Sequence, residues 1–122
     1  RWLAKCPVDS TAHLLRSSAA REIGDIKSHI YHQYFAYALM QSILQSGDGL
    51  SPKTAFKVIS ISEEYAVLRA FGANVTRQAL LTGAVDEMSC EFPGIGKTTR
   101  YFDASIPFNA EAALLEQPKP QP

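Results

Sequence analysis

The stretch SGDGLSPKTAFKVISISEEY, residues 46–65, decides the fold of this chain, because a helical pattern ends in it and a strand pattern begins. Its glycines at 47 and 49 favour turn conformations, so the preceding helix is expected to stop there. Residues 55–59 alternate weakly and include β-branched side chains, which predicts a strand. Ser60 followed by Glu63 is the pattern of a capping box and predicts the next helix. Helices therefore give way to sheet within this stretch.

Upstream of this stretch, the sequence predicts two helices. Pro7 and Asp9 precede Ser10, which is expected to be the N-cap of the first helix. Gly24 ends that helix, and Asp25 is expected to cap the second one. Helices joined by so short a turn are expected to form an antiparallel hairpin over residues 1–46. The apolar positions that recur at helical spacing are Leu14, Leu15, Ala19 and Ile23 in the first helix and Ile26, Ile30, Tyr34, Tyr37, Met40 and Leu44 in the second.

Downstream, the pattern predicts a small sheet with helices. Strands are expected over residues 75–81, 87–92 and 98–102, the last two joined by the turn PGIGK. Asn109 is expected to cap a short helix that runs to Glu116, and QPKPQP, residues 117–122, forms a proline-rich extended tail. The predicted class is α+β, with a tetratricopeptide-like helical hairpin followed by a mostly antiparallel sheet of three or four strands and one or two covering helices. The hairpin and the α+β unit over residues 47–116 are expected to pack as one domain.

Composition narrows the possible partners. The 122 residues suit one domain, and twelve basic and twelve acidic side chains cancel, so no net field attracts nucleic acid. No apolar run approaches the roughly 18 residues that a membrane span requires. The N-terminus, RWLAKCPVD, has neither an initiator Met nor the apolar segment of a signal peptide, so the simplest interpretation is a mature or truncated piece of a longer product. The compartment stays open, with an extracytoplasmic one slightly favoured over the cytoplasm.

The helical part resembles one tetratricopeptide repeat, from Ser10 to about Tyr37. Pro7 would close a preceding unit, and small residues follow where the second helix crosses the first, at Ser28 and Ala36. The chain departs from the repeat pattern at two positions in the first helix, His13 and Arg16. Repeats of this kind need neighbours to bury their faces.

A second resemblance covers most of residues 10–108. The string SGDG, then SP, TAF, VIS and EEY between Ser46 and Tyr65, is similar to an uncharacterised bacterial family with tetratricopeptide-like helices followed by this strand–helix segment. The family's later Tyr-Phe-Asp strand would be residues 101–103 here. The resemblance implies a fold order and no activity.

Several residues could carry chemistry, and each also has a plain structural role. The turn sequence GIGKTT, residues 94–99, resembles the end of a P-loop, but position 91 is Glu91 where that motif needs glycine, so nucleotide binding is rejected. Asp48, between two glycines, is expected to satisfy turn amides. Glu63 is expected to cap a helix and Glu64 to lie on a solvated face. Cys6 and Cys90 are expected to be buried free thiols, with a disulfide as the alternative.

The functional prediction rests on the aromatic second helix. Tyr31, Tyr34, Phe35 and Tyr37 surround that helix, so they cannot all face one neighbour, and exposed tyrosines favour protein contacts. We expect a non-enzymatic interaction module or assembly subunit that binds a protein partner or itself and has no cofactor. The expected partner-binding residues are Trp2, Tyr31, Tyr34 and Tyr37. The alternative is a metal-dependent enzyme or hydrolase that uses Asp25, His29 and His32, which share a helix face.

Overall fold

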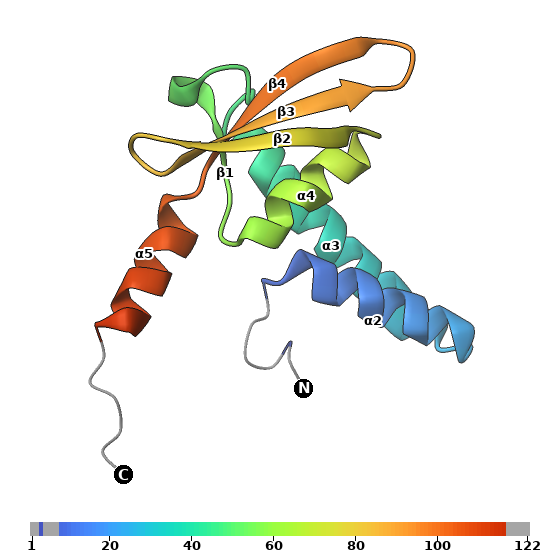
Figure 1. Ribbon diagram of the computed structural model, residues 1–122. Coiled ribbons are helices and arrows are strands. Elements are labelled where there is room, and N and C mark those ends of the chain that lie inside the picture. Colours follow the sequence, from blue (N-terminus) through green and yellow to red (C-terminus); the bar gives the residue numbers. More distant parts are fainter. Residues whose placement is uncertain (1–2, 4–7, 117–122) are drawn as a thin grey trace. The chain divides into compact units, whose positions relative to one another are not determined.

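The computed structural model describes residue 3 and residues 8–116, and the chain divides into two compact units, Arg1–Ser46 and Gly47–Pro122. In the described part of the first unit, two long helices form a hairpin (Figure 1). The second unit contains a four-stranded sheet with helices, which confirms the predicted α+β class and the predicted order of elements. The elements are α2 (Ser10–Glu22), α3 (Ile26–Gln45), the 3-10 helix η1 (Pro52–Thr54), β1 (Phe56–Lys57), α4 (Ile61–Ala70), β2 (Asn74–Leu81), β3 (Val85–Phe92), β4 (Gly96–Asp103) and α5 (Ser105–Leu115).

Local capping sets the ends of the two hairpin helices. Asp9 is the N-cap of α2, because its Oδ1 accepts a hydrogen bond from the backbone N–H of Ala12 at 2.9 Å. The prediction that Ser10 is the cap is therefore wrong by one residue, and Ser10 is buried as the first residue of α2. Gly24, with φ of +79°, turns the chain, and Asp25 caps α3 as predicted by accepting from Ser28 N at 3.1 Å.

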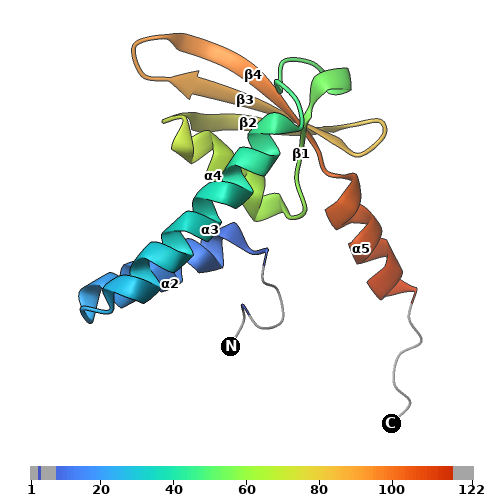
Figure 2. The ribbon, with the colours of Figure 1, turned by 180° about the vertical axis from the view of Figure 1, so that it is seen from behind.

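The hairpin buries small and polar residues and exposes most of its large apolar ones. Leu14, Leu15 and Ile23, whose spacing predicts the first helix, are all exposed. The helices pack along each other (Figure 2) through residues at intervals of three and four on another face of α2. The buried residues of these two helices are Ser10, His13, Ser17 and Ala20 in α2 and Ala36 and Ile43 in α3.

The sheet of the second unit has the strand order β1-β4-β3-β2. Strands β2, β3 and β4 form an antiparallel meander, whereas β1 pairs with β4 in parallel. The turn between β3 and β4 uses Gly94 and Gly96, both with positive φ. The prediction of a mostly antiparallel sheet is thus confirmed, and the turn joins two strands, unlike a P-loop.

One face of β3 forms the core together with helix α4. Asp86, Met88 and Cys90 alternate along the strand and are all buried, and α4 contributes Val67 and Leu68, which are fully buried. Ser60 is the N-cap of α4, but its side chain bonds to Ser62, while Glu63 Oε2 accepts from Ile59 N at 2.8 Å. The predicted helix start is therefore right but the predicted capping box is wrong, because the Ser60 side chain makes no cap hydrogen bond and Glu63 accepts from the residue before the N-cap.

The loop before β1 is held tightly against the sheet. Gly49 N–H donates to Thr54 O, and Gly49 O accepts from Tyr101 N in β4, both at 2.9 Å. Asp48 Oδ1 accepts from Leu50 N and from the hydroxyl of Thr54, so its predicted role in the turn is confirmed. These hydrogen bonds, that of Thr54 first, hold the pKa of Asp48 below its ordinary value.

Helix α5 begins earlier than the sequence predicts. It runs from Ser105, whose N–H donates to Asp103 Oδ1 at 3.0 Å, and Asn109 lies within it. Pro107 is tolerated because the N–H groups of the first helical turn have no intrahelical acceptor, so a residue without an N–H loses no hydrogen bond there. None of the residues of α5 is buried.

Candidate functional site

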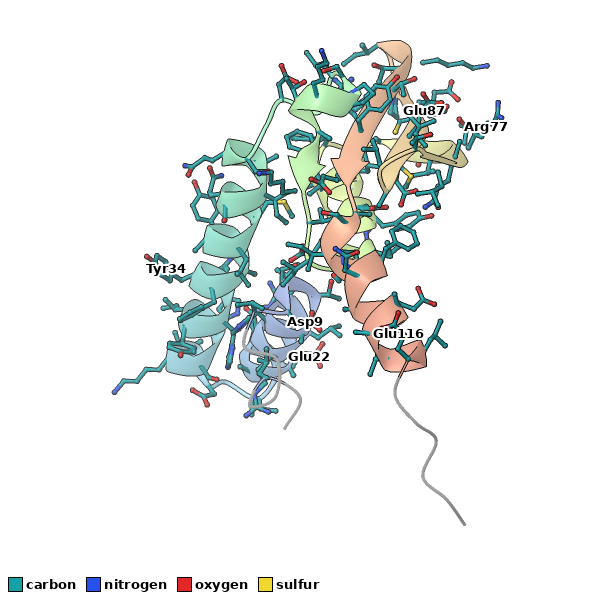
Figure 3. All side chains as sticks on the ribbon, turned by 90° about the vertical axis from the view of Figure 1, so that its left-hand side faces the viewer. Asp9, Glu22, Tyr34, Arg77, Glu87 and Glu116 are labelled. Atoms are coloured by element: carbon teal, nitrogen blue, oxygen red, sulfur yellow. The ribbon has the colours of Figure 1, made fainter. Side chains whose placement is uncertain are left out.

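The outer face of α3 carries a continuous stripe of large apolar side chains, which we call the outer stripe: Ile26, Ile30, Tyr34 and Tyr37. Intervals of four, four and three residues place them on one side of the helix. Each is more than half exposed, and Tyr34, 66% exposed, projects away from α2 in Figure 3. An isolated exposed apolar residue is ordinary, whereas a contiguous set is a candidate binding surface.

Helix α3 is also nearly free of charge. Among its twenty residues, Lys27 is the only one that is an Asp, Glu, Lys or Arg. A helix face that remains in water is normally rich in such side chains. Depletion of charge together with enrichment in tyrosine is the composition of the centre of a protein interface.

Tyr31 differs from the outer stripe because it belongs to an aromatic cluster between the helices. Its ring lies edge-on to His32 at 5.1 Å and against Phe35 at 4.8 Å, and His13 of α2 stacks on Phe35 at 5.2 Å. Tyr31 remains more than half exposed, so one side of its ring packs and the other faces solvent. Tyr34 touches the same cluster only at its edge, with its ring 6.1 Å from that of Phe35, so of the predicted partner residues on α3 Tyr31 is the one with the most aromatic contacts.

Asp25, His29 and His32 are not brought together as a ligand set. Asp25 is occupied in capping α3, and His29 Nδ1 lies 2.8 Å from the hydroxyl of Ser17 and 3.0 Å from Ser17 O. His32 Nδ1 instead lies 2.9 Å from His13 Nδ1. Within residues 8–116, no group of three or more His, Cys, Asp or Glu side chains has the geometry to hold a metal ion.

The contact between His13 and His32 predicts acid sensitivity of the hairpin. Burial first, then the neighbouring His13 and Arg16, lowers the pKa of His32 below 6.5. The stability from neutral His32 is therefore present above pH 6.5 and is lost as pH falls through the lowered pKa, because a protonated His32 has no ring nitrogen left to accept a hydrogen bond and carries a charge near Arg16. An NMR titration should give a pKa for His32 below 6.5 and a higher one in Arg16→Gln. An equal or lower value in that variant would contradict the assignment of Arg16.

Of the two cysteines and Trp2, only Cys90 lies within the described residues. Cys90 is a buried free thiol in the core face of β3, and burial raises its pKa, which makes it a poor nucleophile at neutral pH. Trp2 and Cys6 lie outside the described residues, so the predicted role of Trp2 in partner binding stays a prediction. No described helix combines the length and the hydropathy needed to cross a bilayer.

Sequence reasoning missed a pair of buried acids. Glu64, expected on a solvated face, is fully buried in α4, and Asp86 in β3 is 2% exposed. The two acids are close enough for Asp86 to raise the pKa of Glu64, and both oxygens of Glu64 lack a hydrogen-bond partner within the described residues. The apolar residues around Glu64 in α4, with Ala66, Val67 and Leu68 following it, were a signal that this face is buried.

The described residues form an α+β protein of two units, with an exposed apolar stripe on helix α3. The model of a family described as a domain of unknown function (DUF4919) matches residues 1–112, so the chain belongs to that family. The expected membership of an uncharacterised domain family is confirmed. Neither a comparison with curated proteins nor one with solved structures found a match.

Proposed function

We propose that this chain is a non-enzymatic interaction module that associates with a second copy of itself through the outer stripe of α3. The observation that carries the proposal is the stripe itself, in which four large apolar side chains share one side of a helix and are each more than half exposed. Such a surface gains free energy when another apolar surface covers it. The tetratricopeptide-like pattern and a role as an assembly subunit fit this proposal, because repeats of that type stack against neighbours.

The charge pattern favours a second copy as the occupant. In a two-fold interface the same patch faces itself, so every charge in the patch would meet its own like charge nearby. The helix has one basic residue, Lys27, and no acidic residue, so two copies can approach with little repulsion. A strongly charged partner would find no complementary charge on this face.

Replacing Tyr34 by Lys is expected to weaken self-association at least about tenfold. Tyr34 lies within the outer stripe, and an ammonium group there would be desolvated next to its symmetry mate. Size-exclusion chromatography with light scattering over a dilution series should show the wild type as a dimer or larger species at high concentration. The Tyr34→Lys variant should dissociate at a concentration at least about tenfold higher.

The matched control is Ile95→Lys, which places the same charge on an apolar residue that is 86% exposed in the turn between β3 and β4. Its self-association should equal that of the wild type. A wild type that is monomeric at every concentration would contradict the proposed occupant, as would equal effects of the two substitutions.

A further inference from the structure

Two carboxyl groups lie near each other in the interior of the second unit. Glu64 comes from the first turn of α4, and Asp86 comes from the start of β3. Glu64 is 0% exposed and Asp86 is 2% exposed, so water reaches neither side chain to any useful extent. Two ionised carboxylates in such a place would repel each other without the screening that solvent gives.

The hydrogen bonds around the pair indicate where a proton sits. Within the described residues, both side-chain oxygens of Glu64 are buried without a hydrogen-bond partner, and Asp86 lies close enough to raise the pKa of Glu64. Asp86 Oδ2 accepts from Gln78 Nε2 at 3.2 Å. The Gln78 amide is oriented by Tyr65, whose hydroxyl donates to Oε1 at 2.7 Å. Asp86 thus has a donor that stabilises its carboxylate, whereas Glu64 has none, so a proton that neutralises one of the two groups belongs on Glu64.

We propose that Glu64 and Asp86 form a proton-binding site in the core of the second unit, with the proton on Glu64, and that losing it loosens α4 from the sheet. This inference is independent of the proposed self-association, which uses α3. Deprotonation would place a negative charge on Glu64 near Asp86, and no hydrogen-bond donor within the described residues would stabilise it. The two acids could then reach water only if α4 moved away from the sheet.

The other titratable groups near this face do not neutralise the pair. On this face of β3, the other titratable group is the thiol of Cys90. On β4, the titratable group is Arg100, which lies on the same face of the sheet because it pairs with Met88. Arg100 donates to Thr98 Oγ1 and Thr99 O and acts on Cys90. On β2 the neighbour is the uncharged amide of Gln78. On α4 itself, Glu63 is bonded to Ile59 N.

Burial determines how tightly Glu64 holds its proton. Desolvation first, and then the neighbouring Asp86, raise the pKa of Glu64 from 4.5 to about 8. The site is therefore occupied at neutral pH and empties in mildly alkaline solution. Val67 and Leu68 continue to hold α4 by apolar contact, so the expected change is a shift in an opening equilibrium and not complete loss of the helix.

Two measurements on the full chain test the site. In protein labelled with carbon-13, the side-chain carboxyl resonance of Glu64 should remain that of a protonated acid at pH 6.5 and titrate near pH 8. Amide hydrogen exchange in α4, corrected for intrinsic rates, should show an opening constant that rises about tenfold per pH unit from about pH 5 to pH 8 and is flat above.

Glu64→Gln keeps the shape of the side chain and can donate to Asp86, so it should fold and show no pH dependence of α4 opening. The matched control is Glu87→Gln. Glu87 follows Asp86 in β3 and lies on the opposite face of the strand (Figure 3), so this variant should keep the wild-type pH dependence of α4 opening. A Glu64 resonance that is already ionised at pH 6.5 would overturn the proposal. So would α4 opening that is independent of pH in the wild type, or equally flattened by Glu87→Gln.

Discussion

Gly49→Ala is expected to destabilise the second unit by about 2–5 kcal/mol, a large effect for the addition of one methyl group. Two costs combine. Gly49 has φ of +69°, where an L side chain is strained, and an added Cβ would lie 2.6 Å from Cδ2 of Phe56. The loop cannot relax freely, because Gly49 is bonded to Thr54 on one side and to Tyr101 of β4 on the other. Urea or thermal unfolding of the variant measures the loss.

Gly72→Ala is the matched control for this experiment. Gly72 has nearly the same backbone, with φ of +74°, but an added Cβ would meet no heavy atom within 4 Å. It should therefore cost only the conformational part, about 1–2 kcal/mol. If both substitutions lower the free energy of unfolding equally, the close contact between Gly49 and the ring of Phe56 does not determine the geometry of this loop.

Glu64→Gln is expected to stabilise the protein at alkaline pH and to remove most of the pH dependence of its folding between pH 4.5 and 8. A carboxyl group whose pKa rises on folding binds its proton more tightly in the native state. Its contribution is fully present below pH 4.5, the value for the unfolded chain, and is lost as pH rises to about 8. At about 1.4 kcal/mol per pKa unit, this shift is equivalent to roughly 5 kcal/mol as an upper bound.

Chemical denaturation of wild type and variant at several pH values would measure this difference. The two free energies of unfolding should agree near pH 4.5 and diverge as pH rises, with the variant more stable above pH 8. Glu87→Gln should follow the wild type throughout, because its carboxylate lies on the other face of β3. A wild-type free energy of unfolding that rises between pH 5 and 8, after allowance for the histidines, would contradict the raised pKa of Glu64.

Local sequence signals predicted the order and type of the described elements well. Glycines at 24, 47 and 49 end helices or make turns, and the structure gives two of them, Gly24 and Gly49, positive φ. The residues that cap the helices were predicted less accurately. Asp25 caps as predicted, but Asp9 replaces Ser10 and α5 begins at Ser105 instead of near Asn109, because neighbouring polar residues compete for the same N–H groups.

The candidate site was predicted in part. The aromatic composition of α3 pointed to a partner surface before its exposure was known, and Tyr34 and Tyr37 are exposed. The sequence could not separate Tyr31, which packs on His32 and Phe35, from the other two, since that depends on where α2 lies. Nor could spacing show that His32 meets His13 across the hairpin instead of joining Asp25 and His29 on one helix face.

The stretch of residues 46–65 shows what the sequence by itself determined and what it left to tertiary structure. Its glycines and β-branched residues were enough to place the change from helix to strand, because those preferences act within a few residues. The burial of Glu64 at its end was decided by tertiary structure. A carboxyl group on a helix is solvated or desolvated according to what packs against it, and here that is Asp86 on a strand formed later in the chain.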